Sequence, residues 1–227
     1  MKNQKIHDEA LNLIKLREEK TSNLKDAEAL LVKLVKKDPS CDWAFGLLAQ
    51  ICYWRGEVAG PKDDKRGIYE QGIEYGEKGI EANEDSLESN FWLAVNYGSF
   101  GKEEGMLYAM RLIDPIEKHT RKALEIDESY FYGAPLRVLG RLYNQLPGWP
   151  LSRGDNKKAL DFMLKALKHG PTFYLNHIYI ADIYSGLKKK DKAREHLEWV
   201  IKAPLALHHE KEDARDKEVA KEMLKSL

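Results

Sequence analysis

The feature that most constrains this chain is a spacing of small residues that recurs along it, each time shortly before a helix-breaking signal. In three stretches, a small residue is followed four positions later by a large or flexible one and three positions after that by a small or β-branched one: residues 72–81, 159–168 and 193–202. Breaks follow at Asn83-Glu84, Gly170-Pro171 and Pro204. Residues spaced by four and three share one face of a helix, so each stretch predicts a helix that a neighbour can approach closely.

Two further copies of the pattern bring the total to five. They are Ala27, Leu31 and Leu34 before Pro39, and Ile116, Thr120 and Ala123 before Asp127-Glu128. Four of the stretches are preceded by another helical pattern, a large residue and a small one that lead to Cys52, Tyr97, Tyr143 and Tyr184. Alternating helices with these large and small positions resemble the paired helices of tetratricopeptide repeats (TPR). Each such hairpin buries its apolar face only against its neighbours.

The predicted fold is therefore all-α: a right-handed α-α solenoid of about five TPR-like hairpins with a C-terminal capping helix. The expected hairpins cover residues 6–39, 42–84, 87–128, 133–171 and 174–205, and together they form one predicted domain over 1–205. Residues 206–227 are expected to form the cap, with Leu207, Val219 and Leu224 over the last hairpin. In the weaker first helix, Leu11 and Ile14 are expected to face inward. Extra residues at 56–67, 101–114 and 144–153 are expected to form long loops within hairpins two to four.

Composition and motifs narrow the function. The chain carries 37 basic and 37 acidic side chains. A chain that binds nucleic acid through phosphates usually has a basic excess, so no nucleic-acid partner is expected. The motifs HExxH, GxSxG, GxGxxG and GxxxxGK[ST] are lacking. We therefore expect no enzyme activity, cofactor or metal. Cys41 and Cys52 are expected to be buried and unlinked, because eleven residues of helix separate them by roughly 16 Å.

The location of the protein is predicted from what its sequence lacks. No segment has the length and apolarity of a signal peptide or of a membrane span. The chain as written is expected in the cytoplasm. A periplasmic protein whose signal peptide had been removed would have the same sequence, so that alternative stays open.

A narrower resemblance covers about half of the chain. The segments FWLAVNYGSFG from Phe91, SYFYGAPLRVLGRLYNQLPG from Ser129 and GDNKKALDFMLKALKHGP from Gly154 resemble the T-component proteins of TRAP transporters, a bacterial family of modified TPR folds. They resemble more distantly the eukaryotic regulators of microtubule dynamics. The T-component resemblance implies an exported or lipid-anchored protein that associates with a solute-binding protein and holds a hydrophobic ligand. This chain differs from that family in its N-terminus, which has no export signal or lipobox cysteine.

In a TPR array the first helices of the hairpins line a concave groove, and this gives a candidate site. The groove-facing residues expected here are Trp43, Gln50, Tyr53, Phe91, Val95, Arg137, Arg141 and Asn144. In one interpretation the aromatic residues hold an apolar group while the two arginines bind a carboxylate. In the other interpretation the aromatic residues are interhelix packing and the arginines pair with acidic residues of a neighbouring helix.

The fourth hairpin contains a further candidate, the segment Leu146-Pro147-Gly148-Trp149-Pro150-Leu151-Ser152. Its prolines and glycine predict a turn with Trp149 at the crest. Trp149 is expected either to fold back over the core or to anchor a partner.

Two functions follow from these patterns. The first is a non-catalytic scaffold that binds another protein or a peptide through the groove or the long loops. The second is a transport accessory or carrier of the T-component kind that binds a small hydrophobic or acidic ligand.

Overall fold

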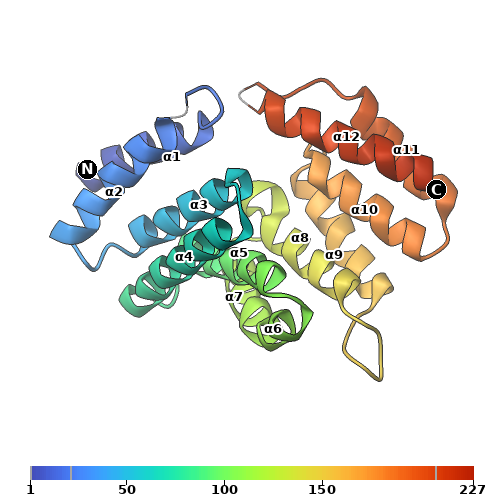
Figure 1. Cartoon of the computed structure of the whole chain (residues 1–227), viewed down its shortest axis with the longest axis horizontal. Coiled ribbons are helices and arrows are strands. Elements are labelled where there is room, and N and C mark those ends of the chain that lie inside the picture. The colour runs from blue at the N-terminus through green and yellow to red at the C-terminus, as the bar shows by residue number, and fades with distance from the viewer. Residues whose placement is uncertain (1, 21, 208) are drawn as a thin grey trace. The chain divides into compact units, whose positions relative to one another are not determined.

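The computed structural model describes residues 2–20, 22–207 and 209–227 and is built from helices (Figure 1). Twelve helices lie in these residues. They form two compact units, Met1–Asp127 (unit 1) and Glu128–Leu227 (unit 2). Each unit has its own buried core and is described by itself. None of the described helices combines the length and the apolar character that crossing a bilayer requires.

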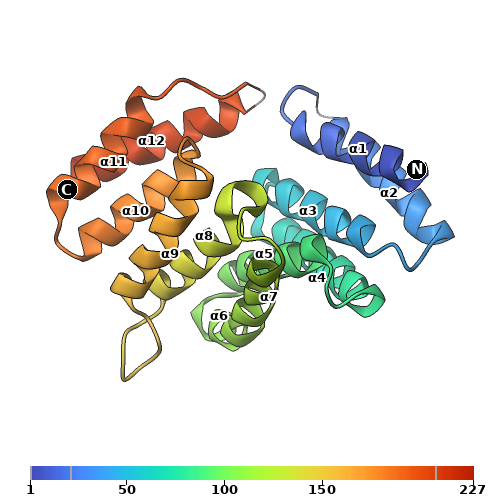
Figure 2. The same ribbon diagram turned by 180° about the vertical axis from the view of Figure 1, so that it is seen from behind.

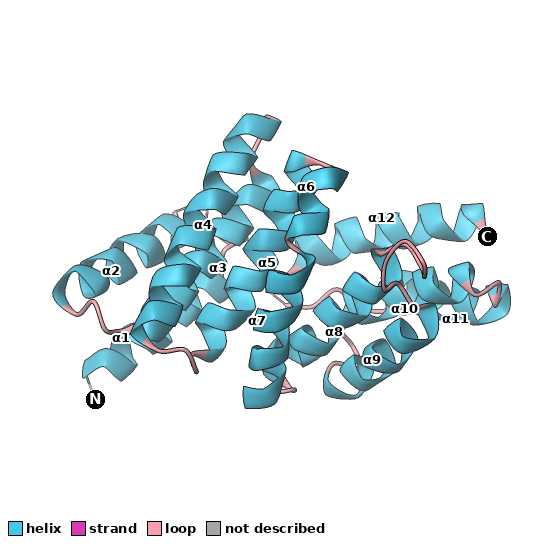
Figure 3. Cartoon of the chain, turned by 90° about the horizontal axis from the view of Figure 1, so that it is seen from below, coloured by secondary structure: helices cyan, strands magenta, loops and turns pink. Residues whose placement is uncertain are grey.

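Unit 1 contains three helical hairpins. Its helices are α1 (Lys2–Lys15), α2 (Asn23–Lys37), α3 (Asp42–Val58), α4 (Lys62–Ala82), α5 (Leu87–Glu104), α6 (Met106–Arg111) and α7 (Ile113–Ile126). The pairs α1/α2, α3/α4 and α5/α7 pack side by side (Figure 3). The core between α1, α2 and α3 contains the small and aliphatic residues of the repeat pattern, among them Ala27, Leu31 and Leu47.

The close contact between α4 and α5 explains the glycines of the repeat pattern. A Cβ atom on Gly79 would lie 2.0 Å from Oγ of Ser89, and one on Gly72 would lie 2.3 Å from Oδ1 of Asn96. Asn96 also ties α5 to α3, because its Nδ2 donates to the carbonyl oxygen of Ala49 at 2.9 Å. The small positions therefore let α5 approach the backbone of α4, as the sequence predicts.

Unit 2 contains two hairpins and the C-terminal helix. Its helices are α8 (Tyr130–Gln145), α9 (Asn156–His169), α10 (Tyr174–Gly186), α11 (Lys190–Lys202) and α12 (Glu210–Ser226). Six residues of the repeat pattern are fully buried in its core: Ala159, Met163, Ala166, Ala193, Leu197 and Val200. The five hairpins and the terminal helix of the predicted all-α fold are confirmed, whereas their grouping into one domain over 1–205 stays a prediction.

Unit 2 begins with an unusual backbone turn. Phe131, Tyr132 and Gly133 have φ angles of 45°, 63° and 74°, which place three consecutive residues in the left-handed region. Only glycine adopts this region without a steric penalty, and each other residue costs about 1–2 kcal/mol. Asn176 holds the turn, because its Nδ2 donates to the carbonyl oxygen of Tyr132 at 3.3 Å. Gly133 itself lies against the backbone of Ala166.

Several local expectations are wrong. Residues 56–67 and 101–114 are mostly helical, because α3 and α5 continue and α4 and α6 begin within them. Of the three expected long loops, the loop between α8 and α9 is present. Leu11 is 38% exposed, and its neighbour Ala10 is buried instead. In the cap, Leu224 packs against the core of unit 2 as expected, whereas Leu207 and Val219 are exposed and Ala220, next to Val219, is buried instead.

Candidate functional site

An aromatic cluster joins the first helices of two hairpins in unit 1. We define it as Tyr53 and Trp54 on α3 with Phe91 and Trp92 on α5. The ring centroids of Tyr53 and Trp92 are 5.5 Å apart, and those of Phe91 and Trp92 are 4.9 Å apart in an edge-to-face arrangement. Trp54 lies 4.8 Å from Tyr53. Spacings of this kind are favourable for aromatic pairs and fix the orientation of each ring.

The cluster has a buried and a partly exposed half. Phe91 and Trp92 are buried, whereas Tyr53 and Trp54 are half-buried. The guanidinium of Arg17 lies 3.8 Å from the ring centroid of Trp54. Two of the predicted groove residues, Tyr53 and Phe91, therefore meet in this cluster. Phe91 contributes as packing, and Tyr53 contributes part of the surface.

Sequence reasoning missed Trp54. It lies four residues after Gln50 on α3, so the helical period could have placed both on one face. Gln50 is buried, and its Oε1 has no hydrogen-bond partner among the residues that the structure describes. Val95 is half-buried on α5, one turn after Phe91.

Trp43 lies apart from the cluster, near the start of α3. Its ring meets that of His7 edge-to-face at 4.8 Å. Trp43 also lines a hollow with residues from α1 and from the start of α5, including Glu88. Desolvation by burial raises the pKa of the Glu88 carboxyl. Trp43 therefore belongs to a polar hollow and not to the aromatic surface around Tyr53.

Arg137, in unit 2, is a buried structural side chain. It is 6% exposed, and its Nη1 donates to Oδ1 of Asn176 at 3.1 Å and to the carbonyl oxygen of Tyr132 at 3.2 Å. Its guanidinium also lies 4.5 Å from the ring centroid of Phe173. These contacts direct Arg137 toward the left-handed turn at residues 131–133.

Arg141 has a different environment one helical turn later. It forms an ion pair with Asp182 of α10 and donates to Oδ1 of Asn144 at 3.0 Å. The amide of Asn144 in turn donates to Oδ1 of Asn156 at 3.1 Å. Pairing with an acidic residue of a neighbouring helix is the second of the two interpretations of the arginines. The geometry around both arginines favours that packing role.

A histidine pair in unit 2 has no counterpart in the sequence predictions. Nδ1 of His177 lies 3.0 Å from Nδ1 of His196, and Nε2 of His177 lies 2.9 Å from the carbonyl oxygen of Pro171. Since a carbonyl oxygen only accepts, Nε2 of His177 carries the proton and its Nδ1 accepts from His196. Desolvation lowers the pKa of both rings, that of His196 to about 4. The pair is therefore uncharged at neutral pH.

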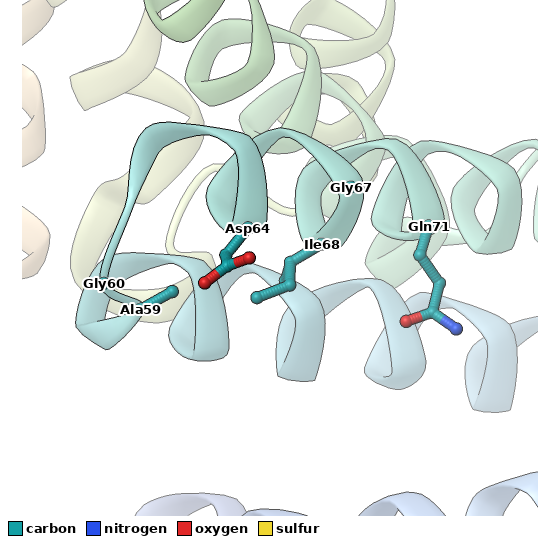
Figure 4. A pocket seen from close by; sticks show the side chains of 6 residues that line it. All are labelled: Ala59, Gly60, Asp64, Gly67, Ile68 and Gln71. Carbon is teal, nitrogen blue, oxygen red and sulfur yellow. The ribbon is translucent and has the colours of Figure 1, made fainter.

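A second hollow lies at the start of α4. It is open to solvent and lined by Ala59, Gly60, Asp64, Gly67, Ile68 and Gln71 (Figure 4). None of the sequence-predicted site residues lines it. Among the described residues that line it, Asp64 is the carboxylate.

The described residues contain no metal-binding group and no reactive thiol. No group of three or more His, Cys, Asp and Glu side chains there is arranged to hold a metal ion. Cys41 and Cys52 are buried and unlinked. Burial raises the pKa of the Cys52 thiol to about 12, so it stays protonated and unreactive at neutral pH.

Comparison with known proteins adds sequence relatives. The family model for regulator of microtubule dynamics protein 1-3 matches residues 9–143. The chain is 25% identical over 178 residues to the human regulator of microtubule dynamics protein 1, and the match covers 73% of this chain and 55% of that protein. The chain thus spans about half the length of the curated relatives that it matches.

Solved structures share the fold at low sequence identity. A thermophilic TPR protein of Thermus thermophilus matches with a TM-score of 0.63 and 16% identity, over 91% of this chain and 98% of that one. YrrB, described as a TPR protein with an unusual peptide-binding site, matches with a TM-score of 0.51 and 15% identity, over 91% of this chain and 86% of that one. At such identities the likeness concerns the fold alone. These matches give no support to the resemblance to T-component proteins.

Proposed function

The chain belongs to the family of regulator of microtubule dynamics proteins 1-3, and from this membership we propose that it is a non-catalytic scaffold that binds another protein. The observation that carries the proposal is the partly exposed half of the aromatic cluster. Tyr53 and Trp54 are neighbours on α3 and are each partly exposed, and contacts of both rings with the buried Trp92 hold their orientation. Aromatic side chains that are fixed before binding lose little conformational entropy on contact with a partner.

The residue types at the proposed contact are those typical of protein interfaces. Tyrosine, tryptophan and arginine are the residues most enriched among those that contribute strongly to binding. Tyr53, Trp54 and Arg17 place all three types together on unit 1. TPR proteins of similar fold include one described by its peptide-binding site, and we propose the same kind of partner here.

The family gives the partner a context. The human relative is named for the regulation of microtubule dynamics. We therefore place the partner of this chain in the microtubule system and assign the contact to the surface around Tyr53.

The experiment is co-sedimentation of the purified chain with assembled microtubules. A Tyr53→Ala variant should bind about tenfold more weakly, because removal of a central aromatic contact typically costs about 1–2 kcal/mol of binding free energy. Tyr132→Ala, which removes a half-exposed tyrosine from unit 2, is the matched control and should bind as the unaltered protein does. Thermal unfolding of both variants checks that the fold is intact.

Two outcomes would count against the proposal. If the unaltered protein were absent from the microtubule pellet, assembled microtubules would be excluded as its partner. Equal binding of the two variants would exclude the Tyr53 surface as the contact.

A carrier of a small hydrophobic or acidic ligand has less support. Arg137 and Arg141, the residues proposed to hold an acidic group, already have partners within unit 2. Native mass spectrometry of the purified protein separates the two functions. A small molecule bound in stoichiometric amount would favour the carrier, and a mass that matches the bare chain would favour the scaffold.

A further inference from the structure

The loop between α8 and α9 carries two prominent apolar side chains. It spans residues 146–155 and extends beyond the ends of both helices (Figures 1 and 2). Trp149 is 89% exposed and Leu151 is 79% exposed, more than any other large hydrophobic residue described in unit 2. Of the two expectations for Trp149, the structure favours the exposed anchor over the side chain folded on the core.

The loop is held in shape at its base. The amide of Gly154 donates to the carbonyl oxygen of Pro147 at 2.9 Å. The amide of Asp155 donates to the carbonyl oxygen of Tyr143 at 3.0 Å. A Cβ atom on Gly154 would lie 1.9 Å from the carbonyl oxygen of Leu146, so the two sides of the loop approach each other as closely as glycine allows. Within the tip, the amide of Leu151 donates to the carbonyl oxygen of Gly148 at 3.1 Å. The apolar tip is therefore presented by a closed loop whose backbone is already ordered.

Basic residues are concentrated in two segments near the base of this loop. They come from the loop and the start of α9, and from the turn between α10 and α11. These two segments lie together, because Nδ2 of Asn156 is 3.0 Å from the position that a Cβ on Gly186 would occupy. Residues 146–158 and 187–192 contain seven basic side chains: Arg153, Lys157, Lys158, Lys188, Lys189, Lys190 and Lys192.

Only two acidic side chains, Asp155 and Asp191, lie in the same segments. The carboxylate of Asp155 accepts hydrogen bonds from the backbone amides of Lys157 and Lys158, so it is used as the cap of α9. The chain as a whole is electrically balanced, with 37 basic and 37 acidic residues. These two segments therefore carry a local excess of positive charge, and one of their lysines, Lys190, donates to the terminal carbonyl oxygen of Leu227.

We propose that this loop docks unit 2 on the surface of an anionic lipid bilayer. Trp149 and Leu151 enter the interfacial region of the bilayer, and the surrounding lysines contact the acidic headgroups. Tryptophan is suited to this position because its ring is largely apolar while its N–H remains hydrated. Basic residues near an anionic surface add to the attraction, and lipid binding of this kind combines both contributions.

The shape of the region favours a bilayer over an acidic peptide. An extended peptide is held in a groove, with pockets for its side chains. The loop is a protrusion, and the two hollows described above lie in unit 1. A protruding apolar tip within a basic surround instead matches a flat, deformable and negatively charged surface.

The experiment measures binding of the full chain to lipid vesicles by co-sedimentation. Vesicles of phosphatidylcholine with phosphatidylserine should bind the protein, and vesicles of phosphatidylcholine alone should bind it much more weakly. The double variant Trp149→Ala, Leu151→Ala should lose about tenfold or more in affinity for the anionic vesicles. Replacing Lys157 or Lys188 by Ala should lower the affinity about fivefold each, and added salt should weaken binding of the unaltered protein.

Matched controls separate this loop from apolar exposure in general. Met106 and Leu107 on α6 are comparably exposed, and the double variant Met106→Ala, Leu107→Ala should bind vesicles as the unaltered protein does. Tryptophan fluorescence gives a second measurement. The emission of the unaltered protein should shift to shorter wavelength on addition of anionic vesicles, and the shift should vanish in Trp149→Phe.

The proposal is wrong if the unaltered chain does not bind anionic vesicles, or if the loop variant binds them normally. If the loop variant lost affinity for a polyglutamate peptide but bound vesicles as the unaltered protein does, the partner would be an acidic protein segment instead. Because the loop lies in unit 2 and Tyr53 in unit 1, microtubule binding and vesicle binding can fail independently.

Discussion

Arg137 and Arg141 are one helical turn apart on α8, yet their surroundings give them different roles. Arg137 is buried and supplies hydrogen bonds to Asn176 and to the left-handed turn. Arg141 is partly exposed and pairs with Asp182. The sequence presents them as a matching pair, because helical spacing puts both on one face but does not reveal which acceptors lie opposite.

Replacement of the two arginines should therefore have unequal effects on stability. Arg137→Ala should lower the free energy of unfolding by about 2 kcal/mol, because buried acceptors lose a charged donor. Arg141→Ala serves as the comparison and should cost less than about 1 kcal/mol, as is usual for exposed ion pairs. Urea unfolding at neutral pH measures both. Equal losses would contradict the structural role assigned to Arg137.

The pair His177 and His196 predicts a dependence of stability on pH. In the unfolded chain histidine has a pKa near about 6.5, whereas burial lowers the folded-state pKa of His196 to about 4. Between these values the unfolded chain binds more protons than the folded one. The free energy of unfolding contributed by the pair is therefore complete above pH about 6.5 and falls as the pH drops toward 4.

A variant isolates this contribution from other groups. Burial also raises the pKa of Asp216 to about 7, and this carboxyl has the opposite effect, since it favours the folded state as the pH falls. Melting temperatures should therefore be compared between the unaltered protein and His196→Gln across this range. The variant should lose less stability on acidification than the unaltered protein. Parallel curves for the two would exclude the pair as a source of the pH dependence.

At the scale of helices, the small positions of the repeat determine how closely neighbours pack. Ala166 on α9 is fully buried, and a Cβ on Gly133 would lie only 2.9 Å from its Cα. Ala166→Trp should lower the free energy of unfolding by about 3 kcal/mol, because an indole has no space between α9 and the start of α8. Lys165→Trp places the same ring on the exposed side of α9 and should change stability by less than about 0.5 kcal/mol. Similar melting temperatures for both variants would contradict the packing of α9.

The helices that follow the repeat pattern could be predicted from the sequence, and the departures from it could not. The spacing of Ala159, Met163 and Ala166 identifies a packed helical face whatever its neighbours are. The expected loop at 56–67 was wrong because its polar residues suit the exposed face of α4 as well as a loop. The left-handed residues 131–133 were also beyond prediction, since they are held by Arg137 together with Asn176, which is distant in sequence.

The candidate site was predicted in part. Tyr53 and Phe91 meet in the aromatic cluster, but Trp54 was missed and Trp43 lies elsewhere, because an error of one position on α3 moves a side chain by about 100° around the helix. The packing alternative for Arg141 could be stated from the sequence. Its partner Asp182 could not be chosen without the position of α10.

At the scale of the whole chain, the two proposed contacts lie on separate units. The aromatic cluster is part of unit 1, and the loop with Trp149 is part of unit 2. Each unit has its own buried cluster of repeat residues. A variant in one contact can therefore be tested without altering the core that supports the other.

The contact between α4 and α5 also restricts how this chain can evolve. In a helical-repeat protein each hairpin contacts only its neighbours, so a hairpin can be exchanged only where its surfaces fit theirs. Here the glycines of α4 fit particular side chains of α5: Gly72 faces Asn96, Gly76 faces Leu93 and Gly79 faces Ser89. A hairpin with ordinary side chains at the glycine positions would collide with α5. Replacement of the second or the third hairpin alone would therefore disrupt this contact, because the two surfaces are matched to each other.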